Sequence, residues 1–181
     1  MKIIETLLQG CYVLEPIPFM DERGLFFESY HQKRLEDYIG KKINFVQDNI
    51  SISKNGVLRG LHYQTGIHSQ AKLVQVLKGE VLDVVVDLRK ESTTYGQHFK
   101  LKLSLENRKI IFIPKGMAHG FLALTDEVIF AYKCDEYYHP QSEAGIMFND
   151  PELDINWEFT ETNMIISEKD IKLPLWKDRK F

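Results

Sequence analysis

Three side chains that can move protons or stabilise charge stand near the ends of predicted β-strands: His62, Lys72 and Tyr132. Histidine is suited to act as a base near neutral pH, because its unperturbed pKa lies near ~6.5. Lysine adds a positive charge, and tyrosine adds a proton donor. Each residue alone is more often structural than catalytic, but together they indicate a site for acid–base chemistry.

Other kinds of chemistry lack their usual motifs. His62 and His119 each stand alone, whereas a metal-binding jelly roll carries two histidines in an H-x-H arrangement. The sequence contains no G-x-S-x-G nucleophile motif, and neither Cys11 nor Cys134 has an evidently electropositive context. It also contains no G-x-G-x-x-G and no P-loop. We therefore expect neither a metal nor a cofactor.

Short β-strands dominate residues 45–138, where Gly, Asn and Pro punctuate apolar and alternating segments. This pattern predicts an all-β fold, an antiparallel sandwich or barrel with a few short helices. Strands are expected at 46–53, 73–77, 81–88, 99–105, 110–113 and 128–134. Residues 78–80 (KGE) are expected to form a hairpin turn. Helical segments are expected at 31–39 before Gly40, at Asp150-Pro151 and after Ser167.

Several of these strands place polar side chains beside apolar ones on a single face, because strand side chains alternate with period two. The predicted faces are Gln47, Asn49, Ser51 and Ser53; Leu58, Gly60, His62 and Gln64; Gln70, Lys72, Val74 and Val76; and Phe130, Tyr132 and Cys134. Such faces fit a barrel whose interior binds a polar ligand.

Composition limits the possible partners. The chain has 181 residues, 44% of them hydrophobic, which predicts a single domain over residues 1–181. Lys+Arg 23 against Asp+Glu 26 gives a formal net charge of -3, without the basic excess of a protein that binds nucleic acid polymers. No apolar run approaches the ~18 residues of a membrane span.

The two cysteines, Cys11 and Cys134, form no C-x-x-C motif and no disulfide framework, and the N-terminus does not resemble a signal peptide. We therefore predict a cytoplasmic protein with reduced thiols. The mildly basic segment 169–181 is expected to be solvated.

An ordered set of motifs covers nearly the whole chain. These motifs are 21–24 (DERG), 56–64 (GVLRGLHYQ), 70–74 (QAKLV), 114–121 (PKGMAHGF), Tyr137-Tyr138, Asn149-Asp150-Pro151 and 167–170 (SEKD). In this set the chain resembles the dTDP-4-dehydrorhamnose 3,5-epimerase family. The resemblance implies a cupin-type β jelly roll, a homodimer, and activity without cofactor or metal. It also implies a dTDP-4-keto-6-deoxyhexose substrate, inverted at C3 and C5 on the way to dTDP-L-rhamnose.

The resemblance implies catalytic roles for four residues. His62 resembles the general base and Tyr132 the general acid. Asp170 resembles the carboxylate that orients His62, and Lys72 the cation that faces the 4-keto oxygen. These roles suit the chemistry, because an enolate next to C4 needs a base, a stabilising positive charge, and a proton donor on the opposite face.

The resemblance also implies a set of substrate contacts. Arg23 and Arg59 resemble diphosphate-binding arginines, whose planar guanidinium groups match phosphate oxygens. Tyr138 resembles the ring that stacks on thymine. Phe19 and Phe26 resemble walls of the sugar pocket. Further expected contacts are Glu28, Gln47, Asp48, Asn49, His119, Glu143 and Lys169.

Two features of the sequence leave alternatives open. Strict alternation puts Arg59 on the face opposite His62, so either a bulge near Gly60 brings them together or the arginine serves a neighbouring subunit's site. The segment 65–69 (TGIHS) departs from the family, many of whose members carry a proline there.

Four other functions are weighed against the 3,5-epimerase. They are a 3-epimerase that inverts only C3, a ketoisomerase on a similar jelly roll, a non-catalytic sugar-nucleotide-binding jelly roll, and a metal-dependent cupin oxygenase.

Overall fold

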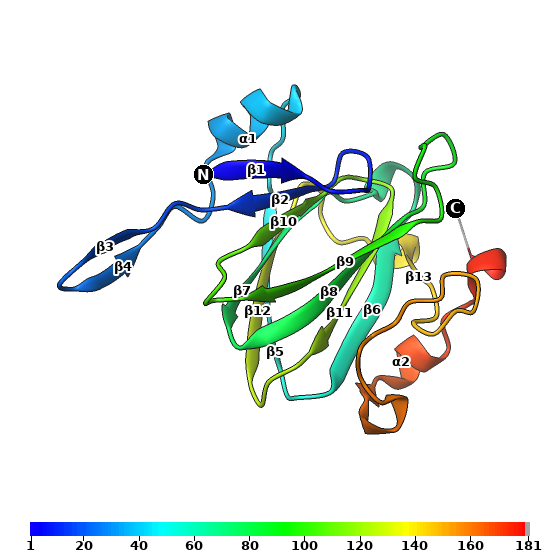
Figure 1. Cartoon of the computed structure of the whole chain (residues 1–181). Helices are drawn as coiled ribbons and strands as arrows, with labels where there is room; N and C mark the ends of the chain where they lie inside the picture. The colour runs from blue at the N-terminus through cyan, green and yellow to red at the C-terminus, as the bar shows by residue number, and fades with distance from the viewer. Residues whose placement is uncertain (180–181) are drawn as a thin grey trace.

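Two β-sheets face each other in the computed structural model, which describes residues 1–179 (Figure 1). The first sheet has the order β1 (Lys2–Glu5), β2 (Tyr12–Glu15), β10 (Ile110–Ile113), β7 (Lys72–Lys78), β12 (Val128–Cys134), β5 (Gln47–Ser53). The second has the order β13 (Glu143–Gly145), β6 (Val57–Gln64), β11 (Met117–Ala123), β8 (Glu80–Asp87), β9 (His98–Ser104). All these pairs are antiparallel, and β14 (Ile165–Ile166) adds to β6 in parallel. The arrangement confirms the predicted cupin-type jelly roll.

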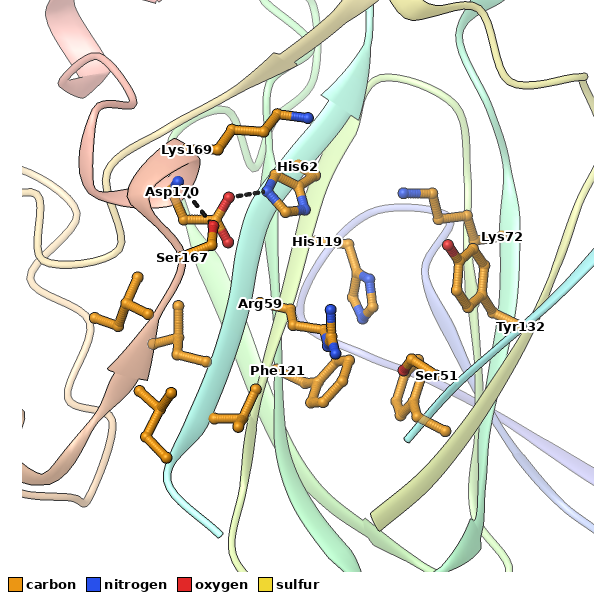
Figure 2. A pocket seen from close by; sticks show the side chains of 15 residues that line it. Ser51, Arg59, His62, Lys72, His119, Phe121, Tyr132, Ser167, Lys169 and Asp170 are labelled. Carbon is orange, nitrogen blue, oxygen red and sulfur yellow. Dashed lines mark hydrogen bonds and ion pairs between the residues drawn. The ribbon is translucent and has the colours of Figure 1, made fainter. Parts of the chain in front are cut away.

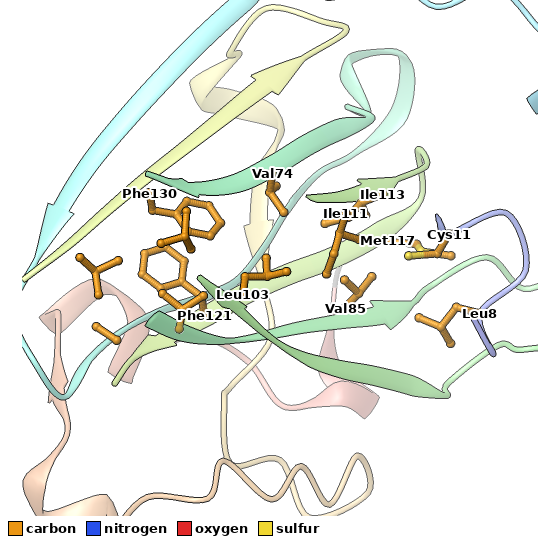
Figure 3. Close-up of a cluster of buried hydrophobic side chains, with 14 residues drawn as sticks. Leu8, Cys11, Val74, Val85, Leu103, Ile111, Ile113, Met117, Phe121 and Phe130 are labelled. Atoms are coloured by element: carbon orange, nitrogen blue, oxygen red, sulfur yellow. The ribbon is translucent and has the colours of Figure 1, made fainter. Parts of the chain in front are cut away.

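Apolar side chains from both sheets fill the space between them (Figure 3). Val74, Ile111 and Phe130 come from the first sheet, and Val85 and Phe121 from the second. The rings of Phe121 and Phe130 stack with their centroids 4.2 Å apart. This packing joins the two sheets into one barrel.

The outer faces of the sheets are covered by other parts of the chain. Helix α1 (Gln32–Ile39) buries Leu35 with Leu14 and Phe112 on the first sheet. The helix ends as predicted, since Gly40 takes a left-handed conformation with φ 70°. Against the second sheet, the chain after β13 packs Trp157 and Ile146 onto the outward side chains of β6, β8 and β11.

The expected hairpin turn at residues 78–80 is wrong. Strand β7 pairs with β10 and β12, whereas β8 pairs with β9 and β11 in the other sheet. The chain therefore changes sheet at Gly79, which has φ 76° and leaves no room for a side chain beside Thr125 and Glu127. The local sequence pattern of two apolar strands joined by a tight turn is the same whether the strands pair with each other or belong to opposite sheets.

A bulge in β6 corrects the predicted face of His62. The pairing of β6 with β11 shifts register between His119 and Phe121, opposite Gly60. Gly60 has φ 133°, and a Cβ there would lie 2.5 Å from Gly120 Cα, so only glycine fits. Leu58 therefore faces the outer cluster, while Arg59 and His62 both face the interior. Of the two alternatives left open by the sequence, the structure shows the bulge.

Two expectations about the C-terminal region are also wrong. Residues 151–154 form turns rather than a helix, with Asp150 Oδ1 accepting the backbone N–H groups of Glu152 and Leu153. The predicted solvated tail packs on the barrel as far as it is described, with Asp170 and Arg179 buried; residues 180–181 lie outside the described residues. The expected helix after Ser167 is present as α2 (Glu168–Ile171). Short 3₁₀ turns occur at Gly66–His68, Pro140–Ser142, Glu161–Asn163 and Trp176–Asp178.

A two-stranded hairpin extends away from the barrel (Figure 1). It consists of β3 (Phe19–Asp21) and β4 (Gly24–Phe26). The hairpin exposes apolar side chains, with Phe19 62% and Phe26 67% exposed. Within residues 1–179, we find no helix whose length and apolarity would let it cross a membrane.

Candidate active site

A cavity of about 560 Å³ opens between the two sheets, within the range of small-molecule sites (Figure 2). His62, Lys72 and Tyr132 line it, and they also line a smaller adjoining cavity of about 110 Å³. The three side chains named from the sequence therefore lie where the two cavities meet. An elongated ligand that occupies both cavities would pass these three side chains.

His62 is held by a buried carboxylate. Its Nε2 lies 2.7 Å from Asp170 Oδ1, and Asp170 is 3% exposed. Asp170 is fixed in turn because Ser167 caps α2, accepting the Asp170 backbone N–H at 3.1 Å. Burial alone would raise the pKa of Asp170, but hydrogen bonds from His62, the Gly60 N–H and Ser167 lower it below its usual value. The ionised carboxylate fixes the tautomer of His62 and stabilises its protonated form.

Lys72 and Tyr132 stand across the cavity from His62, on adjacent strands β7 and β12 of the other sheet (Figure 2). Lys72 Nζ lies 6.0 Å from the centroid of the Tyr132 ring. Burial lowers the pKa of Lys72 and raises the pKa of Tyr132. The tyrosine is therefore protonated at neutral pH and can donate its proton from the face opposite His62.

Cationic groups from β6 and α2 lie in the same cavity. Arg59 Nε donates to Ser53 Oγ at 3.1 Å, which fixes the arginine on the interior side of the bulge. Lys169 precedes Asp170 on α2 and also lines the cavity. His119 lies directly opposite His62 in the β6–β11 pairing.

The smaller cavity carries polar and aromatic groups. Gln47 and Asn49 line it, and their side chains form a hydrogen bond of 2.9 Å. Tyr138 donates from its hydroxyl to Glu143 Oε2 at 2.6 Å, and Lys169 Nζ lies 2.5 Å from Glu143 Oε1. Side-chain amides can donate and accept hydrogen bonds, and a tyrosine ring offers a flat surface, so these groups suit a nucleobase.

Five of the expected substrate contacts lie outside both cavities. Phe19, Arg23 and Phe26 lie on the β3–β4 hairpin, where Arg23 pairs with Asp21. Glu28 forms an ion pair with Arg34 at 2.7 Å. Asp48 faces outward on β5 and pairs with Lys133 at 2.9 Å. Within one chain, the structure does not bring these side chains to His62.

Three residues around the site were not identified from the sequence. Ser53 anchors Arg59, a role not visible without the fold, whereas Ser167 caps α2 at the helix start that the sequence already indicates. Asp83 lies behind His119, with its Oδ2 2.8 Å from His119 Nε2. One signal could have found it, because Asp83 is a single carboxylate within the apolar run 81–86.

Within the described part of the chain, no three His, Cys, Asp or Glu side chains are grouped so as to hold a metal ion. What the cavity does hold is a carboxylate-supported histidine opposite an ammonium and a phenol. Such a set can remove a proton next to a carbonyl, stabilise the enolate, and return a proton to the other face. The fold and the site together define a jelly-roll isomerase that works by proton transfer.

Comparison with known proteins identifies the family. A family model described as dTDP-4-dehydrorhamnose 3,5-epimerase matches residues 5–178. A Salmonella typhimurium protein of that description is 49% identical over 97% of this chain and 95% of its own length. The chain belongs to the dTDP-4-dehydrorhamnose 3,5-epimerase family, as the sequence resemblance predicted, and is thus an isomerase.

Solved structures agree with this assignment. The crystal structure of dTDP-4-dehydrorhamnose 3,5-epimerase from Elizabethkingia anophelis superposes with a TM-score of 0.97 and 48% identity, covering 100% of this chain and 99% of the other. An epimerase from Legionella pneumophila, solved in complex with dTDP-4-keto-L-rhamnose, superposes with a TM-score of 0.93 and 48% identity, covering 98% of this chain and 93% of the other.

Proposed function

We propose that the protein inverts C3 and C5 of dTDP-4-dehydro-6-deoxy-D-glucose to give dTDP-4-dehydro-L-rhamnose, in dTDP-L-rhamnose biosynthesis, as one epimerase domain over residues 1–181. The observation that carries this proposal is the His62–Asp170 pair at 2.7 Å, facing Lys72 and Tyr132 across one cavity. The family assignment and the ligand of the Legionella pneumophila structure support the choice of substrate.

The chemistry follows from the C4 carbonyl. C3 and C5 both flank it, so a proton on either carbon becomes acidic when the resulting enolate is stabilised. His62 takes the proton, becoming imidazolium next to the Asp170 carboxylate, and the electron pair moves onto the C4 oxygen. Lys72 places its positive charge beside that oxygen. Tyr132 donates a proton to the opposite face of the same carbon as the electron pair returns from the oxygen, which restores the carbonyl and inverts the carbon. His62 then gives its proton to solvent, and the tyrosinate left at Tyr132 takes one from solvent, so both groups are reset.

The two cavities divide the rest of the ligand. Arg59 and Lys169 supply positive charge for the diphosphate at the edge of the larger cavity. Gln47, Asn49 and Tyr138 in the smaller cavity suit thymine. A protein of net charge -3 needs only these few cations to bind such a ligand, and does not need the basic surface required by a nucleic acid polymer.

We propose that the protein acts as a homodimer in which the β3–β4 hairpin completes the partner's site. The hairpin extends away from its own barrel and exposes Phe19 and Phe26, the two rings that the family resemblance assigns to the sugar pocket. The outer face of β5 also exposes Ile50 and Ile52. An apolar hairpin and an apolar sheet face on the same molecule match each other across a two-fold axis.

Mixing two inactive variants tests the dimer. Arg23→Ala damages the hairpin, and His62→Ala damages the barrel site. A mixed dimer would contain one site with both defects and one with neither. If the chains re-pair at random, about half of the dimers are mixed, and each mixed dimer has one intact site of its two. A return of activity on mixing, up to about a quarter of the wild-type value, would therefore support the proposal. A mixture that stays inactive although the chains exchange contradicts it.

The reaction itself is tested by NMR in deuterated water with dTDP-4-keto-6-deoxyglucose. Deuterium at both C3 and C5 is expected. Deuterium at C3 alone would indicate a 3-epimerase, and a carbonyl shifted to C3 would indicate a ketoisomerase. Ligand binding without exchange would indicate a non-catalytic binding protein, and stoichiometric iron in the purified protein would favour an oxygenase.

We further propose a cytoplasmic location, which the two free buried thiols of Cys11 and Cys134 support.

A further inference from the structure

Asp83 is a fully buried carboxylate inside the barrel. It lies on β8 between Val81 and Val85, whose side chains also face the interior, and it is 0% exposed. Its Oδ2 lies 2.8 Å from His119 Nε2, whereas its Oδ1 has no hydrogen-bond partner within residues 1–179. A buried carboxylate with one bare oxygen is costly to keep for packing alone.

The His119–Asp83 pair repeats the geometry of the His62–Asp170 pair on the neighbouring strand. His119 and His62 are direct partners in the β6–β11 pairing, and both side chains line the cavity. Each histidine has a buried carboxylate at 2.7 or 2.8 Å from its Nε2. Nε2 of His119 is engaged with Asp83 while the side chain lines the cavity, so the rest of the ring is left for a ligand there.

Asp83 also acts on Lys72 through its charge. Burial lowers the pKa of Lys72, and three groups oppose this effect: Cys134, Asp83 and Glu143. The Cys134 thiol, with its pKa raised to about 11, is uncharged at neutral pH. Glu143 is already engaged by Lys169 and by the Tyr138 hydroxyl. Asp83 differs from Glu143 in being fully buried inside the barrel, and it opposes the effect of burial on the pKa of Lys72.

We propose that Asp83 is a positioning residue for the reaction, holding His119 at the wall of the cavity and placing a buried carboxylate on the same side of the barrel interior, where it acts on Lys72. This inference rests on the proposed function. Asp83 does not touch the ligand, because His119 stands between it and the cavity. Asp83 acts on the site through its hydrogen bond to His119 and through its electrostatic effect on Lys72.

The titratable and charged groups around Asp83 come from every element that packs against it. Among the described residues they include His119 on β11, which is hydrogen-bonded to Asp83, and Lys72 on β7 and Cys11 before β2, which interact with it through charge. The neighbouring interior positions of β9 are apolar. Burial moves the pKa values of Lys72 and Tyr132 in opposite directions, lowering the first and raising the second.

Asp83→Asn tests the charge while keeping an acceptor for His119. Without the carboxylate, the pKa of Lys72 falls further, so the basic limb of the kcat–pH profile moves to lower pH. At a pH on the basic limb of the wild-type profile we expect kcat of the variant to fall by about tenfold, with KM little changed. Asp150→Asn is the matched control, because Asp150 is 2% exposed and accepts backbone N–H groups far from the cavity. The control is expected to lose stability without any shift of the profile.

A superimposable pH profile for Asp83→Asn and wild type would overturn the proposal. So would an equal shift in Asp150→Asn, because the effect would then follow from lost stability alone.

A double-mutant cycle on unfolding tests the same coupling without substrate. Lys72→Met leaves the Asp83 carboxylate buried without its cation, so this variant is expected to be destabilised. Adding Asp83→Asn is expected to restore much of the lost stability, so that the two effects are strongly non-additive. Additive effects would overturn the charge coupling. Because this measurement needs no turnover, it separates failure of the inference from failure of the proposed epimerase activity, which would appear as wild-type protein without deuterium exchange.

Discussion

Replacement of Asp170 by asparagine tests the central feature of the site. The asparagine keeps the size of the side chain but removes the charge that lies 2.7 Å from His62 Nε2 when the imidazolium forms. Two unit charges about 4 Å apart at an effective dielectric constant of about 20 attract by about 4 kcal/mol, and a hydrogen bond to a charged group contributes about 1.5–3 kcal/mol. A loss of about 3–4 kcal/mol from the transition state corresponds to a fall in kcat of about 100–1000-fold. Initial rates of deuterium incorporation at C3 and C5, followed by NMR, measure this fall.

The control for this variant is Glu168→Gln on the same helix, α2. Glu168 has a side chain 94% exposed and pairs only with Lys172 at 3.7 Å among the described residues, so kcat should stay at the wild-type value. An Asp170→Asn enzyme within tenfold of wild type would refute the role given to the carboxylate.

The same substitution changes how stability depends on pH. The pKa of Asp170 is lowered in the folded protein, so its carboxylate stabilises the fold above its unfolded pKa near ~3.9. This contribution is lost as the pH falls through the lower, folded value. The difference in unfolding free energy between wild type and Asp170→Asn should therefore shrink in acid, as measured by urea denaturation at several pH values.

Three further predictions concern the same barrel. Lys72→Met should slow exchange at C3 and C5 alike by about 100-fold, because both protons leave through an enolate on the same oxygen; selective loss at one carbon in the NMR assay would contradict this. Tyr132→Phe should retain proton removal but lose inversion, giving deuterium without a change of configuration, and full inversion would contradict the assigned donor. Gly60→Ala should destabilise the fold by about 2–5 kcal/mol in urea denaturation, since its Cβ would lie 2.5 Å from Gly120 Cα. Gly66→Ala, with φ 62° and open space, should cost only about 1 kcal/mol, and equal losses at the two glycines would contradict the steric argument.

The strands could be predicted from the sequence because their signals are local. Alternation placed Gln47 and Asn49 on one face of β5, and that face does line the cavity. The partners of each strand depend on contacts far apart in the chain, which explains why the turn at Gly79 was misassigned. The bulge at Gly60 reverses the phase of alternation within β6, so a strict period of two put Arg59 on the wrong side.

The site was predictable in part for a similar reason. His62, Lys72 and Tyr132 stood out by residue type, and the motif resemblance added Asp170, which no spacing within the sequence connects to His62. Asp83 was missed because its importance lies in its surroundings, a buried interior with His119 and Lys72 as neighbours. The hairpin residues Phe19 and Phe26 belong to the expected pocket only if a second chain is present, which no single chain reveals.

The position of Asp170 in the chain has a consequence for synthesis. Strands β1 to β12, which contribute His62, Lys72 and Tyr132, all leave the ribosome before α2 does. The barrel can thus close around its cavity while the carboxylate partner of His62 is still being made. A nascent or clipped chain that ends before Ser167 would lack the carboxylate partner of His62 and the part of the cavity wall that α2 supplies. The arrangement around His62 is therefore complete only when the last α-helix has been made.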